Sequence, residues 1–209
     1  MISRRNLPLG AIVLGAGASS RMGRPKLLLP WGETSIIGHI IGQWRELGAS
    51  QTAIVCRPND LELAAELGRL SFPLAGRIEN PQPERGMFSS IRCAANWGGW
   101  KSELTVWAIV LGDQPHLRAD MLRALLAFQR EHVDAICQPV YGGHARHPVL
   151  LPRKVWDELK DSRVKTLKEF LKRTSSPVVK CPIEDSGLGL DLDRPEDYEK
   201  AVKFHLRKL

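Results

Sequence analysis

The sequence predicts one α/β domain of three layers, with a mostly parallel sheet between two layers of helices. Short apolar runs alternate with segments whose apolar residues repeat at helical spacing, and no internal repeat or linker divides the 209 residues. The run Thr105–Leu111 is apolar throughout, as expected of a strand buried on both faces. A chain of this length can bury one sizeable core, so we treat residues 1–209 as a single domain.

Each expected strand is a short run of apolar residues. The first of them ends at Gly15, where a loop of small and basic residues begins. In chain order the expected strands are Leu9–Leu14, Thr52–Cys56, Thr105–Leu111, Val133–Val140, Pro148–Leu151, Val178–Ile183 and Leu188–Leu192.

The expected helices have apolar residues three and four positions apart, and several carry recognisable ends. Gly48 fits the end of the first helix, and Asn59 or Asp60 can cap the second. Asp193 can cap the last helix, which starts near Arg194. The preceding helices are Ser35–Leu47, Leu61–Leu70, Ser89–Trp97, Ala119–Glu131, Arg153–Leu159 and Val164–Arg173.

The composition argues against a membrane protein and against a nucleic-acid partner. Apolar residues make up 43% and charged residues 25%, and no apolar run is long enough to span a bilayer. The net charge is +7, but the basic residues are dispersed and have no aromatic residues among them to stack on bases. We therefore expect solvated helix faces, with a smaller share of the charge serving an anionic substrate.

The cysteines indicate a reducing compartment. Cys56, Cys93, Cys137 and Cys181 lie far apart, without the clustered spacing of a disulfide framework or a zinc site. The basic start of the chain lacks the apolar run of a signal peptide. We therefore expect a cytoplasmic protein.

The segment 14–26 has the composition of a polyphosphate-binding loop. It follows the first strand directly, and its small residues allow backbone N–H groups to approach an anion. The planar guanidinium of Arg21 can contact two phosphate oxygens at once, and the ammonium of Lys26 adds a second positive charge. The spacing is not that of a P-loop, and Ser20 and Pro25 disagree with a dinucleotide fingerprint.

Three aspartates follow expected strands near the end of the sheet where ligands bind. Asp113 comes after Thr105–Leu111, and Asp191 and Asp193 lie two residues apart at the end of Leu188–Leu192, so on an extended chain they point the same way. Asp193 already has a role as a helix cap, which makes Asp191 the better ligand candidate. Two carboxylates together with triphosphate oxygens suit Mg²⁺.

Two further segments carry candidate binding residues. In 84–90, Gly86 permits close approach, and Ser89 and Ser90 can offer hydroxyls and helix N-terminal amides. In 142–148, His147 can position a substrate phosphate. From its residues alone, an ordinary helix start explains the first segment equally well, and a lone histidine in a loop such as His147 is more often structural.

These five segments together resemble the MobA-like nucleotidyltransferases, and most of all molybdenum cofactor cytidylyltransferase. The resemblance covers about residues 9–198 and rests on the order and spacing of the segments. They are LGAGASSRMGRPK (14–26), GMFSS (86–90), GDQP (112–115), HPV (147–149) and DLDRPED (191–197).

The resemblance implies a Rossmann-like fold and a role for each segment. The nucleotide would lie on the 14–19 backbone, its phosphates on Arg21 and Lys26, and Mg²⁺ on Asp113 and Asp191. The residues implied at the nucleotide are Leu14, Gly15, Ala16, Gly17, Ser19, Gly86, Met87, Ser89 and Ser90. The loop with Arg146 and His147 faces the second substrate in the family, which commonly has glycine where Arg146 stands.

The implied reaction moves a nucleoside monophosphate from a nucleoside triphosphate to a phosphorylated acceptor and releases pyrophosphate. CTP is favoured, because cytidine-using members usually carry alanine where Ala16 stands and guanine-using members carry glycine; Gly15, where the family usually has alanine, would restore some room beside it. The favoured acceptor is molybdenum-bearing molybdopterin. Alternatives are a GTP-using or a sugar- or alcohol-phosphate nucleotidyltransferase, an NADP-dependent reductase with Arg57 at the cofactor, and a non-enzymatic nucleotide-binding protein.

Overall fold

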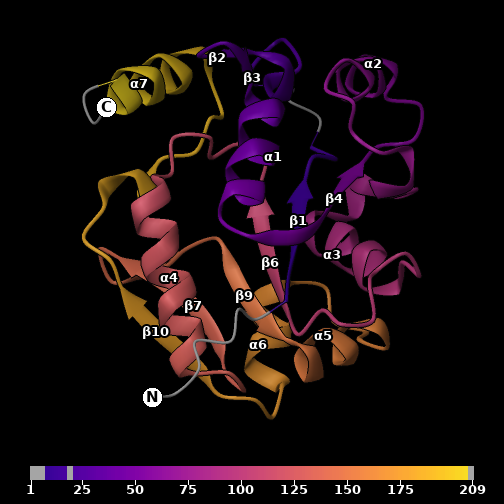
Figure 1. Cartoon of the computed structure of the whole chain (residues 1–209), viewed down its shortest axis with the longest axis vertical. Helices are drawn as coiled ribbons and strands as arrows, with labels where there is room; N and C mark the ends of the chain where they lie inside the picture. The colour runs from indigo at the N-terminus through magenta and orange to yellow at the C-terminus, as the bar shows by residue number, and fades with distance from the viewer. Residues whose placement is uncertain (1–7, 18–20, 207–209) are drawn as a thin grey trace.

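The computed structural model describes residues 8–17 and 21–206 and contains the alternating strands and helices that the sequence predicts (Figure 1). The central sheet consists of β1 (Leu9–Leu14), β4 (Ala49–Cys56), β5 (Arg77–Glu79), β6 (Val106–Leu111), β7 (Ile136–Tyr141), β8 (His144–Ala145), β9 (Val149–Pro152) and β10 (Val178–Pro182). The α-helices are α1 (Ile36–Glu46), α2 (Leu61–Arg69), α3 (Met87–Asn96), α4 (Ala119–Glu131), α5 (Arg153–Lys160), α6 (Leu167–Arg173) and α7 (Pro195–Leu206). Short 3-10 helices are η1 (Lys26–Leu28), η2 (Leu74–Gly76), η3 (Pro83–Arg85) and η4 (Ser186–Gly189), and β2 (Pro30–Trp31) pairs with β3 (Thr34–Ser35) as a separate hairpin.

The sheet is mostly parallel, as predicted. Its order is β10-β7-β9-β6-β1-β4-β5, with β8 beside β7. Strand β1 is parallel to both of its neighbours, β4 and β6, whereas β9 runs antiparallel to β6 and β7. The carboxyl ends of β1, β4 and β6 therefore meet at one edge of the sheet, which is where ligands bind in such folds.

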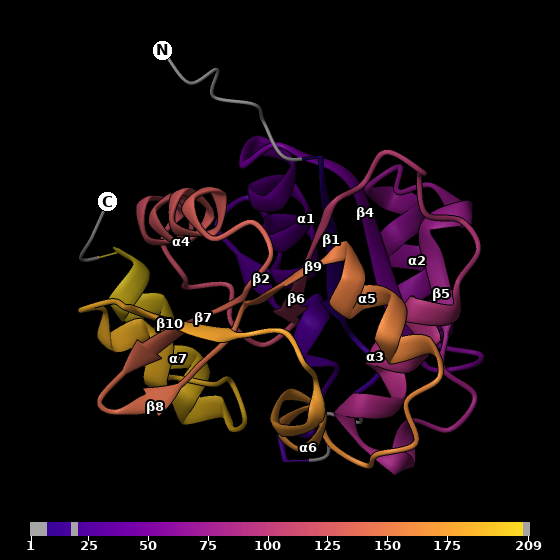
Figure 2. The ribbon, with the colours of Figure 1, turned by 90° about the horizontal axis from the view of Figure 1, so that it is seen from below.

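Helices cover both faces of the sheet, so the three-layer prediction is confirmed. Alternate residues of β1 face opposite layers: Ala11 and Val13 pack with helices α1, α2, α4 and α7, and Ile12 packs with α3, α5 and α6. Figure 2 shows α1 and α4 on one side of the strands and α3, α5 and α6 on the other. Burial on both faces explains why the central strands are apolar throughout.

Helix starts follow from the side chains that cap them. Ser35 Oγ accepts from the backbone N–H of Gly38 at the start of α1, and Asp60, not Asn59, accepts from Leu63 N–H at the start of α2. Thr166 caps α6, which therefore begins at Leu167 and not at Val164 as expected.

The predicted strand Leu188–Leu192 is wrong. Residues 186–189 form the 3-10 helix η4, and the Leu190 N–H donates to Gly187 O at 3.1 Å. Leu188 and Leu192 are fully buried in the core under α7. Apolar residues at this spacing resemble the alternating pattern of a strand, which is why a strand was predicted. Asp191 and Asp193 consequently do not share the side of an extended strand.

Asp193 is not the cap of the last helix. Helix α7 begins at Pro195, and the Asp197 carboxylate accepts from the Arg194 N–H at 3.1 Å. The Asp193 carboxylate instead pairs with Arg21. This change frees Asp193 for the site described below.

Strands of two or three residues, namely β2, β3, β5 and β8, were missed because so short a segment shows no periodicity. Within residues 8–17 and 21–206, no helix is long and apolar enough to cross a membrane.

Candidate active site

The loop after β1 is anchored to the neighbouring strand by Gly15. Its N–H donates to Val55 O at 2.8 Å. A Cβ at this position would lie 3.0 Å from Leu27 Cδ1 and 3.2 Å from Val55 O, so the missing side chain faces the core. Gly15 therefore gives no extra room to a base beside Ala16, and that expectation is wrong.

The next residues carry the loop outward. Ala16 is 7% exposed, whereas a Cβ added at Gly17 would meet no atom of the described, non-adjacent residues within 4 Å. The backbone at Gly17 is therefore open to a ligand. Ser19 lies outside the described residues.

Lys26 occupies the centre of the site and joins segments that are far apart in the sequence. Its Nζ donates to Asp113 Oδ2 at 2.7 Å and to Leu192 O at 3.3 Å. The side chains of Lys26 and Asp113 are only 15% and 21% exposed. The pair therefore lies in a partly desolvated environment, where its attraction is stronger than at an open surface.

Arg21 lies at the outer side of the same cluster. Its Nη1 is 2.8 Å from Asp193 Oδ2, and Asp193 Oδ1 is 3.8 Å from Lys26 Nζ. The two predicted cations thus meet through Asp193, a carboxylate that the sequence had assigned to a helix end. Arg21 is 65% exposed, so it can turn toward a ligand at little cost.

Asp191 lies beside Asp113, as the metal prediction requires. Its Oδ1 accepts from Gln114 Nε2 at 2.8 Å, and Leu192 N–H donates to Asp113 O at 3.2 Å. Desolvation raises the pKa of the Asp191 carboxyl, and the nearby Asp113 charge raises it further. The structure therefore holds two like charges together at the end of β6.

Gln114 is a site residue that the sequence reasoning missed. It is 5% exposed, and its Oε1 is buried without a hydrogen-bond partner among the described residues. The sequence did carry a signal for Gln114, because this polar residue comes directly after Asp113, the carboxylate that follows a buried strand.

The carboxylates fit a divalent cation that also takes oxygens from its substrate. Asp113 Oδ1 is buried and has no hydrogen-bond partner among the described residues, so this oxygen is left to accept a ligand while Oδ2 pairs with Lys26. No group of three or more His, Cys, Asp or Glu side chains in the described part of the chain could hold a metal alone. Magnesium commonly binds one or two carboxylates plus substrate phosphates, which this arrangement matches.

The segment 86–90 is shaped by Gly86 and by Asn80. Gly86 has φ +87° and ψ 178°, a conformation reserved for glycine, and it places the start of α3 at Met87. Asn80 is 1% exposed, and its Nδ2 donates to Ser89 Oγ at 2.8 Å and to Ser90 Oγ at 3.0 Å. The sequence reasoning missed Asn80, although it follows directly after β5. The Met87 side chain is 41% exposed.

Arg146 lies near enough to Asp191 for their charges to interact, and His147 lies beside β6. Desolvation keeps the Asp191 pKa raised, and the Arg146 charge offsets a small part of that rise; the Arg146 Nε is buried without a partner among the described residues. His147 Nδ1 lies 3.4 Å from Ile109 O, and burial lowers the pKa of His147. Arg146 is thus placed to meet an anion, whereas His147 is held neutral against β6.

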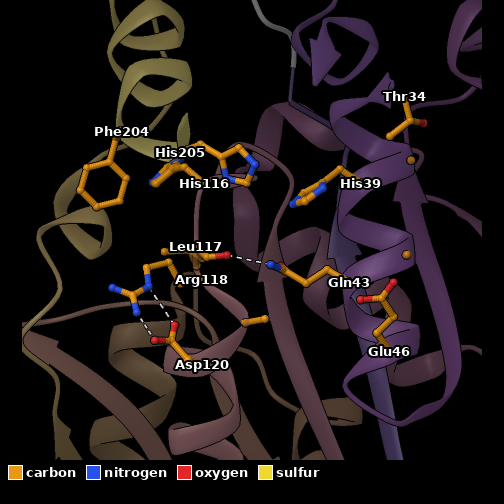
Figure 3. A pocket seen from close by; sticks show the side chains of 13 residues that line it. Thr34, His39, Gln43, Glu46, His116, Leu117, Arg118, Asp120, Phe204 and His205 are labelled. Carbon is orange, nitrogen blue, oxygen red and sulfur yellow. Dashed lines mark hydrogen bonds and ion pairs between the residues drawn. The ribbon is translucent and has the colours of Figure 1, made fainter. Parts of the chain in front are cut away.

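A separate cavity of about 520 Å³ lies between α1, the start of α4 and α7 (Figure 3). None of the predicted site residues lines it. Its wall includes His116, which is fully buried and has its Nε2 2.9 Å from Gly187 O. His116 therefore ties the segment after Asp113 to the segment that leads to Asp191.

A family model described as the MobA-like NTP transferase domain matches residues 11–178. The molybdenum cofactor cytidylyltransferase of Escherichia coli (strain K12) is 25% identical over 197 residues, which cover 92% of this chain and 95% of the relative.

Solved structures share the fold. The crystal structure of Rv0371c from Mycobacterium tuberculosis H37Rv is 25% identical, has a TM-score of 0.73 and covers 94% of this chain and 97% of its own. The molybdopterin-guanine dinucleotide biosynthesis protein A of Archaeoglobus fulgidus is 19% identical, with a TM-score of 0.69 and coverage of 96% and 100%.

Proposed function

The chain belongs to the family of MobA-like NTP transferases, and from that premise we propose that it transfers CMP from CTP to molybdenum-bearing molybdopterin. The observation that carries the proposal is a cluster at the carboxyl edge of the sheet. It contains two cations that can bind phosphate, Lys26 and Arg21, and a pair of carboxylates, Asp113 and Asp191.

In the proposed reaction a phosphate oxygen of the acceptor attacks the α-phosphorus of the nucleotide. The new bond joins that oxygen to the α-phosphorus, and the bond from the α-phosphorus to the β-bridging oxygen breaks, so that pyrophosphate leaves with the bonding electrons. The attacking oxygen is already anionic, so no side chain has to remove a proton. Catalysis then consists of alignment and charge stabilisation.

Each residue of the cluster has a task in this scheme. Lys26 and Arg21 neutralise the leaving pyrophosphate, and Asp113 and Asp191 would hold Mg²⁺. The metal would supply charge neutralisation at the phosphate oxygens. In the protein without nucleotide, Asp113 holds Lys26 in place and Asp193 holds Arg21 in place. The phosphates of a bound nucleotide would compete with these two carboxylates for the cations.

The nucleoside end is proposed to lie between the 14–17 backbone and the 86–90 segment. Gly17 and Gly86 both have open space at the Cβ position, so backbone groups there are accessible. The preference for CTP is supported by Ala16 and by the cytidylyltransferase relative. Arg57, which the NADP-dependent alternative would use, lies 3.4 Å from Asp60 Oδ2.

We place the acceptor at Arg146, because its charge acts on Asp191 and its Nε is buried without a hydrogen-bond partner among the described residues. The four cysteines are free thiols, which supports the cytoplasm as the compartment.

The test is pyrophosphate release from each of the four nucleoside triphosphates, with magnesium and with molybdenum-bearing molybdopterin, a sugar phosphate or no acceptor. We expect release that needs both the metal and the acceptor and is fastest with CTP. Faster release with GTP would overturn the base assignment, and release with a sugar phosphate but not with molybdopterin would overturn the acceptor.

A further inference from the structure

A groove of about 630 Å³ runs along helix α3, beside the connection between α5 and α6. Its described lining includes no residue of 14–17 or 21–26 and neither Asp113 nor Asp191, and it shares only Phe88 and Ser89 with the proposed nucleoside segment 86–90. Its lining residues are Asn80, Pro81, Gln82, Arg85, Phe88, Ser89, Arg92, Cys93, Asn96, Arg163, Val164 and Lys165.

The groove gathers positive charge without any negative charge in its lining. Arg85, Arg92, Arg163 and Lys165 line it, and no Asp or Glu does. Among the described residues none of these four side chains forms an ion pair.

Donor groups in the groove are also left without acceptors. The Arg92 Nε is buried and has no hydrogen-bond partner among the described residues. Arg85 Nη1 donates to the neutral Gln82 side chain at 2.7 Å, so its charge stays uncompensated. Four like charges around one cavity repel one another, and an anion between them removes that repulsion.

We propose that this groove is a binding site for a small molecule that carries several phosphate charges. Three of the four cations are arginines, whose planar forks match phosphate oxygens in pairs. The volume lies in the range of small-molecule sites. The ligand is either a free polyphosphate anion or the phosphate chain of a nucleotide, and the two share this chemistry.

Cys93 offers a local readout of occupancy. It lines the groove and is partly exposed, whereas Cys56, Cys137 and Cys181 are buried. Burial raises the pKa of the Cys93 thiol, so labelling needs a mildly alkaline buffer. Protection of this thiol reports an anion in the groove and not one at Arg21 and Lys26.

The experiment measures alkylation of Cys93 by neutral iodoacetamide, by mass spectrometry of its peptide, against increasing sodium tripolyphosphate without divalent metal. Sodium chloride at equal ionic strength serves as the blank. We expect tripolyphosphate to slow labelling, and we expect Arg92→Gln/Arg163→Gln to raise the half-protecting concentration at least about tenfold, since two charge-assisted contacts are lost. A parallel series with CTP distinguishes a nucleotide from free polyphosphate.

Two matched variants make the result specific. Arg123→Gln/Lys172→Gln removes two exposed charges from α4 and α6, and Arg21→Ala removes a cation of the proposed reaction centre; both should keep the protection. Circular dichroism checks that each variant is folded. Unprotected Cys93 in the wild type, equal loss of protection in Arg123→Gln/Lys172→Gln, or loss in Arg21→Ala would each overturn the proposal.

Discussion

At the scale of single residues, the site keeps two carboxylates close together, which lowers the stability of the folded protein and suits the binding of a cation. Asp191 keeps a carboxylate next to Asp113, and its raised pKa means that the folded protein prefers the protonated form more than the unfolded chain does. The contribution of this carboxyl to stability is therefore largest in acid and is lost as the pH rises through its raised pKa.

Asp191→Asn should consequently separate activity from stability. We expect magnesium-dependent turnover to fall by at least about a hundredfold, a loss of roughly 2.7 kcal/mol or more of transition-state stabilisation. The thermal midpoint at pH 7 should stay equal or rise, because a like charge is removed while Gln114 keeps a polar partner. A clear drop in the midpoint with unchanged turnover would mean that Asp191 is structural.

Lys26 and Arg21 should differ in how much each contributes to the stability of the folded protein, a difference that the sequence alone does not indicate. Lys26→Ala leaves Asp113 partly buried and unpaired, so we expect about 2 kcal/mol of lost stability, less than for a fully buried pair because both side chains keep some exposure. Arg21→Ala breaks an exposed pair and should cost under about 1 kcal/mol.

Both substitutions should reduce turnover strongly, because both remove charge from the leaving pyrophosphate. Urea unfolding and initial rates on the same preparations provide the comparison. Full activity in both variants would contradict the phosphate-binding role, and equal stability losses would contradict the assignment of Lys26 as the buried partner.

At the scale of elements, the sequence predicted the long strands and helices and failed where a segment is short or irregular. Strand β1 and helix α4 have the predicted bounds, because their apolar residues repeat over several positions. The segment 188–192 carries buried leucines at strand-like spacing, but η4 and the packing under α7 decide its conformation.

The same limit applies to the site. Lys26 and Asp113 were predicted because they stand in recognisable segments that follow the strands β1 and β6, and Asp191 was predicted from a segment that turned out not to be a strand. Gln114, Asn80 and the pairing of Arg21 with Asp193 depend on contacts between segments far apart in the chain, and no local pattern carries those contacts.

The turn before α3 provides a prediction for an element. Gly86 has φ +87° and ψ 178°, so Gly86→Ala should cost about 1–3 kcal/mol through backbone strain, although no atom would meet the new Cβ. Because the turn positions Met87–Ser90, we also expect weaker nucleotide binding by calorimetry.

Gly42→Ala in the middle of α1 is the matched control. A Cβ there also meets no atom within 4 Å, but the helical backbone suits alanine, so this variant should gain about 0.5–1 kcal/mol. Similar effects of the two substitutions would show that the conformation of Gly86 is not what matters.

At the scale of the whole molecule, one buried histidine and three partly buried ones tie stability to pH. Burial is the main cause that lowers the pKa of His39, His116, His147 and His205. The unfolded chain takes up protons near the ordinary histidine value of about 6.5, whereas the folded protein resists them. Their stabilising contribution is therefore present above about pH 6.5 and is lost as the pH falls below it.

Thermal unfolding at pH 7.5 and at pH 5.5 checks this. We expect a lower midpoint at pH 5.5, and a smaller difference between the two pH values in His116→Gln. The same substitution at His144, which is exposed on β8, should leave the difference as in the wild type. A midpoint that does not fall at pH 5.5 would contradict the account of the buried imidazoles.

The fold brings three loops, from β1, from β6 and from the segment before α7, to one edge of the sheet, and the proposed reaction depends on that meeting. The most direct test follows labelled phosphorus from CTP, with magnesium and molybdenum-bearing molybdopterin, in the wild type and in Asp191→Asn. The account predicts that the α-phosphorus label moves to the acceptor product while the γ-label appears in pyrophosphate, and that both stop in Asp191→Asn. Transfer of the γ-label to the acceptor, or release of the α-label as free CMP without an acceptor product, would contradict it.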